Sequence, residues 1–173
     1  MFDNFYLREI AKEGLNKISN DRKSASDLGL DHCNQCGTCC WRRPCSLVKK
    51  DIPTIAKYLN ITEKELFNKY LVVDEITWSS LVILPRRHSQ EDLAGKYVPS
   101  NRTYDMDTPC VFFDDEKRIC AIHNVKPTGG RSYGCYSKNN EHQDYSWDEE
   151  DVIKLGWNGD KYWDDYDDNC KYY

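Results

Sequence analysis

The sequence lacks any apolar run long enough to cross a membrane. We also expect no signal peptide, because the start, MFDNFYLREIAKEG, contains acidic residues and no basic-then-apolar order. Hydrophobic residues make up 39% and charged residues 31% of the 173 positions, which is typical of a globular protein with a polar surface. We therefore expect a cytoplasmic protein that contacts no membrane.

Repeats and familiar catalytic motifs are also missing. Because the sequence has no internal repeat and no low-complexity linker, we expect a single domain over residues 1–173. It contains no Ser-His-Asp elbow, no Walker loop and no Gly-rich dinucleotide fingerprint. The function must be sought in other residues.

Positive charge is scarce towards the C-terminal end. Residues 144–173 contain ten acidic residues against Lys154, Lys161 and Lys171, a net charge of −7, so the other residues carry +2 of the total of −5. We treat residues 137–173 as an acidic, aromatic C-terminal segment. Nucleic-acid binding requires a basic face, so we expect no nucleic-acid partner. The segment is either a solvated surface or a docking surface for a basic protein.

Hydrophobic periodicity predicts several short helices. One is expected over residues 4–19. A second is expected to start at Asp51, which can cap it, and to bury Ile52, Ile55, Ala56 and Leu59. A third is expected to start at Thr62, which forms a capping box with Glu65, and to bury Leu66, Phe67 and Tyr70. A fourth is expected to follow a capping box of Ser146 and Glu149 and to run to about Leu155.

Two segments are predicted to be extended. Residues 75–84, EITWSSLVIL, are β-branched and aromatic and predict one strand. Residues 85–108 predict a long loop. The runs 111–113 and 119–122, joined by DDEKR, predict a hairpin with Cys110 and Cys120 at the base of its arms. These elements indicate an α+β fold of short helices and an antiparallel hairpin, organised around a cysteine-ligated metal centre.

Cysteine is abundant, and four of the nine cysteines lie within eight positions, in the stretch CNQCGTCC. These are Cys33, Cys36, Cys39 and Cys40. Cytosolic thiols are kept reduced, so such a cluster favours metal binding or catalysis over a disulfide framework. The odd total also argues against complete internal pairing.

The spacing of the cluster indicates a soft metal without naming it. Cys33-x2-Cys36 can direct two sulfurs at one metal, and Gly37 permits the tight bend between them. The run to Cys39 begins like a bacterial ferredoxin, but Arg43 stands at the fourth position and the next cysteine is Cys45. A zinc site would take a second pair from far along the chain, and Cys110 with Cys120 or Cys135 could supply it.

Three stretches together resemble a known family. They are CNQCGTCC, PCSLVKKDIPTIAKYLNITEKELFNKYL and PCVFFDDEKRICAIHNVKP. They resemble the YkgJ-type cysteine-cluster proteins, which are described as zinc- or iron-chelating domains, over about residues 33–136, here called the cysteine-cluster core. The flagellin lysine methylase is a larger relative with a similar cluster, and some members are labelled iron–sulfur oxidoreductases.

The resemblance implies a ligand set. Cys33, Cys36, Cys39 and Cys40 match the first family block, and Cys110 and Cys120 match the second. The third block, R-P-x-x-C-R, aligns with Lys126–Arg131 and places Gly130 where the family has cysteine. Either Cys135 or the additional Cys45 could supply that sulfur. Val111 and His123 also depart from the pattern, where the family has proline and tyrosine.

Three other residues remain. Cys170 has no partner at metal spacing and is predicted to be a free thiol, the alternative being a further metal ligand from the end of the chain. Arg131 lies beside the cluster residues, where its charge could offset that of thiolates. His123 could ligate a metal or donate a hydrogen bond to a thiolate.

Two functions are consistent with these patterns. The first is an iron–sulfur protein, most simply with one [4Fe–4S] cluster, acting in electron transfer or as the cofactor of a redox or group-transfer reaction with an unidentified redox partner. The second is a zinc-binding structural or protein-interaction module without catalysis.

Overall fold

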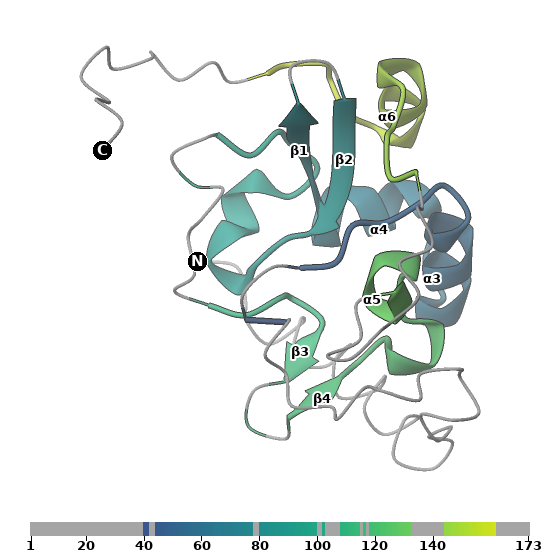
Figure 1. Ribbon diagram of the computed structural model, residues 1–173, viewed down its shortest axis with the longest axis vertical. Helices are drawn as coiled ribbons and strands as arrows, with labels where there is room; N and C mark the ends of the chain where they lie inside the picture. Colours follow the sequence, from purple (N-terminus) through teal and green to yellow (C-terminus); the bar gives the residue numbers. More distant parts are fainter. Residues whose placement is uncertain are drawn as a thin grey trace.

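The structure is a computed structural model that describes residues 40–41, 44–77, 80–99, 102, 108–114, 116, 118–132 and 144–161. The helix expected over residues 4–19 lies outside these ranges, as does much of the acidic C-terminal segment. Within them the chain forms short helices and two separate antiparallel hairpins (Figure 1). The expected α+β class is confirmed.

Helix α3 spans Asp51–Leu59 and buries Ile52, Ile55 and Ala56, as its periodicity predicts. It ends at Asn60, whose φ of 57° is the left-handed conformation that asparagine tolerates at a helix end. The expected cap is wrong: Lys50 occupies the N-cap position without a side-chain cap, and Asp51 is the first helical residue. The Asp51 carboxylate binds groups outside the first turn instead, as described below.

Helix α4 spans Glu63–Tyr70 and has the predicted capping box. The Thr62 hydroxyl accepts a hydrogen bond from the Glu65 N–H at 3.1 Å, and the Glu65 carboxylate accepts one from the Thr62 N–H at 3.0 Å. Leu66, Phe67 and Tyr70 are buried, as expected. The prediction succeeds because every group involved lies within one turn of chain.

The single strand predicted over residues 75–84 is wrong. The chain forms two antiparallel strands, β1 (Leu71–Thr77) and β2 (Ser80–Pro85), with Val73 opposite Ile83 and Thr77 opposite Ser80. Residues 78–79, between the strands, are Trp-Ser, which is not one of the Asn-Gly or Gly-containing pairs that mark a two-residue turn. The apolar run therefore looks like one continuous strand in the sequence, although the chain reverses direction within it.

Strands β1 and β2 bind the segments that lie beside their hairpin. Leu47 donates its N–H to the Ile83 carbonyl, and Trp147 donates its N–H to the Leu81 carbonyl, both at 2.9 Å. On the other side, Val98 donates to the Val73 carbonyl of β1 at 2.7 Å. The hairpin thus gains bonded neighbours along both edges.

The expected loop over residues 85–108 contains a 3₁₀ helix, η2 (His88–Leu93). The hairpin predicted over residues 111–113 and 119–122 is confirmed but shorter: β3 (Phe113–Asp114) pairs with β4 (Ile119–Cys120). Short helices η4 (His123–Val125) and α5 (Thr128–Ser132) follow.

Helix α6 spans Glu149–Leu155 and ends where expected, at Gly156, whose φ is 118°. Its expected capping box is wrong, because Asp148 rather than Ser146 occupies the N-cap and makes no side-chain cap bond. The Ser146 N–H instead donates to the carboxylate of Asp144 at 2.9 Å, so the chain enters α6 through a local turn.

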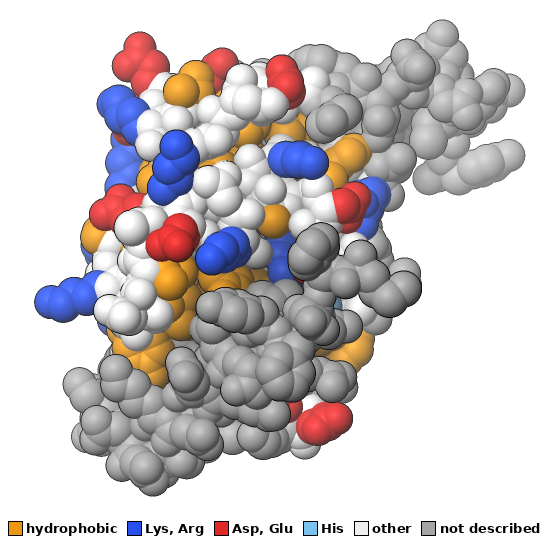
Figure 2. Space-filling model, turned by 180° about the vertical axis from the view of Figure 1, so that it is seen from behind, with side chains coloured by type: hydrophobic (Ala, Val, Ile, Leu, Met, Phe, Trp, Pro, Cys, Tyr) orange, Lys and Arg blue, Asp and Glu red, His pale blue; other side chains and the backbone are white. Residues whose placement is uncertain are grey.

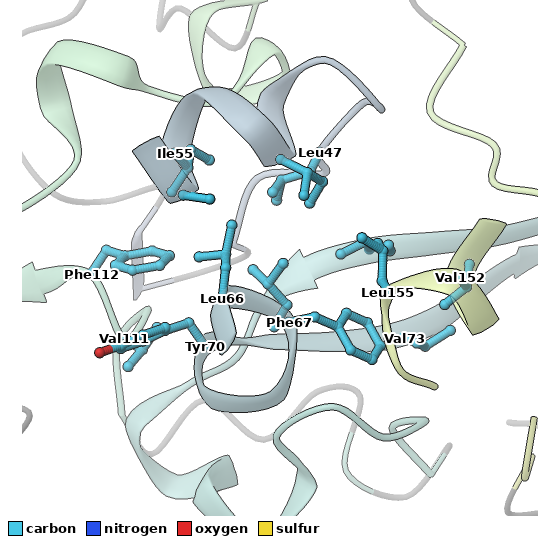
Figure 3. Packing of buried hydrophobic residues seen from close by; sticks show 14 of the residues in the cluster. Leu47, Ile55, Leu66, Phe67, Tyr70, Val73, Val111, Phe112, Val152 and Leu155 are labelled. Atoms are coloured by element: carbon cyan, nitrogen blue, oxygen red, sulfur yellow. The ribbon is translucent and has the colours of Figure 1, made fainter. Parts of the chain in front are cut away.

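One main hydrophobic cluster joins these elements. Helices α3, α4 and α6 contribute Ile55, Leu66, Phe67 and Leu155, which face strand residues and Phe112 (Figure 3). The Tyr70 and Phe112 rings stack with centroids 5.4 Å apart. Since Cys110 and Phe113 belong to the same cluster, the segment that leads into β3 packs directly on the core.

The described surface on the side opposite Figure 1 carries mixed charge. Lys and Arg side chains are interspersed there with Asp and Glu side chains (Figure 2). None of the helices in the described part of the chain has the length and apolar composition needed to span a membrane.

Candidate metal centre

Four of the predicted or additional ligand cysteines fall within the described residues: Cys40, Cys45, Cys110 and Cys120. None of the four is in a disulfide. Cys33, Cys36, Cys39 and Cys135 lie outside the described residues, as does the predicted free thiol Cys170. The four that are described come from segments that lie far apart in the sequence.

The first and second cysteine blocks meet through their backbones. The N–H of Cys110 donates to the carbonyl oxygen of Cys40 at 2.8 Å. In Figure 1 the short dark blue piece at residues 40–41 accordingly lies beside the segment that leads into β3. The end of the CNQCGTCC stretch is therefore fixed against Cys110.

Arg87 reinforces this junction, although the sequence did not single it out. Its guanidinium is only 3% exposed and donates to the Trp41 carbonyl at 2.6 Å and to the Thr108 carbonyl at 2.9 Å. Arg87 also forms an isolated antiparallel bridge with Cys110. One planar side chain thus connects the residue after Cys40 to the residues before Cys110.

Arg86 places a second buried cation beside the same segment. Its side chain is 1% exposed and donates from Nε to the Lys69 carbonyl at 2.8 Å and from Nη1 to the Arg87 carbonyl at 2.9 Å. Among the described residues it forms no salt bridge with a carboxylate. Burial lowers the pKa of this guanidinium, and Cys110 is among the acidic groups that oppose the shift. The only sequence signal was an Arg-Arg pair directly after an apolar strand.

Cys110 is the most deeply buried of the four cysteines. Burial raises the pKa of its thiol well above the ordinary range, the Cys120 and Cys45 thiols raise it further, and Arg87 opposes the shift. A buried thiol of this kind stays protonated until an electrophile displaces the proton. In the absence of a bound cation, Cys110 is therefore poorly suited to acting as a free nucleophile.

Asp51 ties the start of α3 to the start of α5. Its carboxylate accepts hydrogen bonds from the Thr128 N–H at 2.9 Å, the Thr128 hydroxyl at 2.8 Å and the Val48 N–H at 3.0 Å. Helix α5 carries Gly130 and Arg131, so Asp51 fixes the part of the chain that aligns with the third family block. The sequence suggested Asp51 only as a local cap.

The two residues predicted to lie beside the ligands have different environments. His123 is buried, at 4% exposure, in η4. Arg131 is exposed, and its Nε donates to the Lys126 carbonyl at 2.7 Å. Arg86 and Arg87, rather than Arg131, are thus the cations that the structure buries beside Cys110.

The donor chemistry fits a soft metal, but the described residues do not complete a site. Cys110 interacts electrostatically with the Cys120 and Cys45 thiols, and its backbone binds Cys40. Thiolates are the preferred ligands of zinc and of iron–sulfur clusters. In the described ranges, no three His, Cys, Asp or Glu side chains lie close enough to hold a metal ion.

Comparison with known proteins agrees with this chemistry. Residues 32–151 match the family model CxxCxxCC, described as "Putative zinc- or iron-chelating domain". No curated protein and no solved structure matches the chain. The match spans more than half of the chain and includes the first cysteine block, Cys45, Cys110, Cys120 and Cys135. The chain therefore belongs to the CxxCxxCC family of zinc- or iron-chelating domains.

Proposed function

We propose that this protein holds an iron–sulfur cluster, most simply one [4Fe–4S] cluster, and uses it in electron transfer or in a redox or group-transfer reaction. The cluster is held by thiolates drawn from Cys33, Cys36, Cys39, Cys40, Cys110, Cys120 and Cys135. The supporting observation is the junction between Cys40 and Cys110, where two family blocks distant in sequence are bonded together beside two buried arginines.

The chain's own residues have separable roles in this proposal. Arg87 and the Cys110 N–H hold the two cysteine segments together, and Asp51 holds α5 in place. The main hydrophobic cluster excludes water from the Cys110 side. Arg86 supplies positive charge that offsets the negative charge of thiolates in a medium of low dielectric constant. When bound, the cluster supplies reversible one-electron transfer.

Two features of the sequence favour a cluster over zinc. Structural zinc sites close with four nitrogen or sulfur ligands, whereas this chain carries seven candidate cysteines. Cys39 and Cys40 are adjacent, and neighbouring side chains point in different directions, so both can serve only a large centre or two centres. A zinc-binding interaction module remains the competing function, since the family description names both metals.

Anaerobic purification followed by an absorbance spectrum and analysis for iron, zinc and acid-labile sulfide tests the proposal. We expect a broad band near about 400 nm and about four iron and four sulfide atoms per chain. Cys110→Ser should lose most of the iron, whereas the matched control Cys170→Ser should keep it. A colourless protein with stoichiometric zinc would refute the cluster and support the interaction module.

A further inference from the structure

The segment that contains Cys45 packs unusually closely against α5. A Cβ atom built on Gly129 would lie 2.5 Å from the Ser46 carbonyl oxygen, and one built on Gly130 would lie 2.7 Å from the Cys45 sulfur. Real Cβ atoms essentially never approach other heavy atoms within 3.0 Å. The Cys45–Ser46 segment therefore occupies space that is available only because positions 129 and 130 are glycine.

Two consecutive glycines are costly in a helix. Each is less favourable than alanine by about 1 kcal/mol in a helix interior, and α5 has only five residues. The cost is offset locally by the Asp51 bonds to Thr128 and by the Gly130 and Arg131 N–H bonds to the Pro127 carbonyl. The close approach of the Cys45 sulfur, together with that of the Lys126 side chain at 2.9 Å, gives a physical reason for glycine at position 130.

The Cys45 segment is also fixed in relation to the other cysteines. Leu47, two residues later, is fully buried and bonds to Ile83 of β2. The extension of β2 through Arg87 pairs with Cys110. The Cys45 thiol is half-buried. One strand therefore positions both Cys45 and Cys110.

We propose that Cys45 is a ligand of the metal centre. Its sulfur takes the place of a sulfur that a cysteine at position 130, on the other side of this contact, could otherwise provide. This inference rests on the proposed metal centre. Glycine at position 130 leaves room for the Cys45 sulfur, because a side chain at position 130 would displace it.

Paired substitutions in the full-length, anaerobically purified protein test this proposal. Cys45→Ala should lose most of the iron that the wild-type protein binds and should change the visible spectrum. The double variant Cys45→Ala with Gly130→Cys should recover iron. The matched control, Cys45→Ala with Gly130→Ala, fills the same space without sulfur and should remain depleted. Far-UV circular dichroism identifies the variants that fold.

The outcomes separate this proposal from the metal centre itself. Absence of metal from the wild-type protein would refute the proposed function. Full iron content and an unchanged spectrum in Cys45→Ala would overturn the ligand role of Cys45 while leaving the centre intact. Equal recovery with alanine and cysteine at position 130 would show that packing, and not sulfur, is required. If Cys45→Ala does not fold, Cys45→Ser provides the same comparison with a smaller change in shape.

Discussion

At the scale of single residues, three side chains bond groups that are distant in sequence. Arg87 reaches a carbonyl 46 positions away, and Asp51 reaches groups 77 positions away. Trp147 donates its ring N–H to the Leu47 carbonyl at 2.9 Å, 100 positions away. Since Leu47 and Thr128 flank the Cys45 contact, these bonds determine the geometry of the cysteine-bearing segments more directly than the helices do.

Arg87→Lys tests the junction between the cysteine blocks. Nη1 of Arg87 donates to both the Trp41 and the Thr108 carbonyl. Lysine keeps the charge, but its side chain ends one bond short of Nη1, so we expect at least one of these carbonyls to lose its partner. The protein should unfold more easily by about 1–3 kcal/mol and bind less iron. Urea unfolding and iron analysis measure the two effects. The exposed arginine of α5 provides a control, because Arg131→Lys should change stability by no more than about 0.5 kcal/mol.

Arg86 contributes buried charge as well as hydrogen bonds. Arg86→Met should lower the reduction potential of a bound cluster, since removal of a nearby cation disfavours the more negative reduced state. Electrochemistry on the loaded protein measures this shift, and a merely structural role would not produce it. An unchanged potential in a folded, fully loaded variant would contradict the prediction.

At the scale of elements, β2 and its extension organise the candidate centre. Ile83 binds Leu47, the Arg86 carbonyl accepts from Val111, and Arg87 pairs with Cys110. Helix α5 is attached from the other side, through Asp51 at the start of α3. The cysteine-bearing segments therefore depend on a strand and a helix that carry no ligands themselves.

Asp51→Asn tests the attachment of α5. The Val48 and Thr128 N–H groups share Oδ2 of Asp51, and the Thr128 hydroxyl donates to Oδ1. The substitution replaces one of these oxygens with a donor, so either both N–H groups or the hydroxyl loses its acceptor. We expect a loss of about 1–3 kcal/mol and faster hydrogen exchange at Thr128–Arg131, with α4 unchanged. Glu63→Gln, at an exposed carboxylate, is the control and should leave exchange in α5 as it is. Uniformly faster exchange would argue against a local role.

Salt bridges to Lys49 attach the start of helix α6. Lys49 contacts Asp151 at 2.6 Å and Asp148 at 3.0 Å, and the hydrogen bonds from Lys154 and Lys49 lower the pKa of Asp151 to about 2. A carboxylate whose pKa is lowered by folding stabilises the protein above its ordinary pKa of 3.8, and this stabilisation disappears as the pH falls to about 2.

The Asp151→Asn variant should therefore be less stable than the wild-type protein at pH 7 and nearly as stable as it once the pH has fallen to about 2. The groups are exposed, so the difference should be small and should shrink with added salt. Urea unfolding across pH, at low and high salt, measures it. A difference that does not depend on pH would show that Asp151 acts through packing.

At the scale of the whole molecule, the main hydrophobic cluster and the candidate centre are adjacent but distinct. Helices α3, α4 and α6 pack with β1 and β2 through residues that need no metal. Apart from Phe113 of β3 and the half-buried Cys120, the shorter hairpin and α5 contribute no residue to this cluster in the described part of the chain. Their order should therefore depend more strongly on metal.

Metal removal tests this division. After anaerobic treatment with a chelator, we expect far-UV circular dichroism to change little, while hydrogen exchange rises at Ile119–Cys120 and Thr128–Ser132 and stays slow in α4 and β1. Cooperative loss of all structure would contradict the prediction and would make the centre a requirement for the entire fold.

Features that depend on residues close together in the sequence could be predicted, and features that depend on distant residues could not. The stripe of α3 and the capping box of α4 involve neighbours within one turn, so the sequence alone predicted both. The reversal between β1 and β2 was missed because Trp-Ser is not a recognisable turn pair. The cysteine blocks were visible as motifs, but Arg87, the Asp51–Thr128 bonds and the Cys45–Gly130 contact depend on residues that only folding brings together.

The bond between Cys110 and Cys40 has a consequence for biosynthesis. Translation proceeds from the N-terminus at about 5–20 residues per second, so Cys40 leaves the ribosome seconds before Cys110, which binds it, has been made. During that interval the Cys40 thiol is open to oxidants and to scavenging metals. For the proposed metal centre, we therefore expect loading to follow the completion of residue 120 or to be preceded by a protein that shields the nascent thiols.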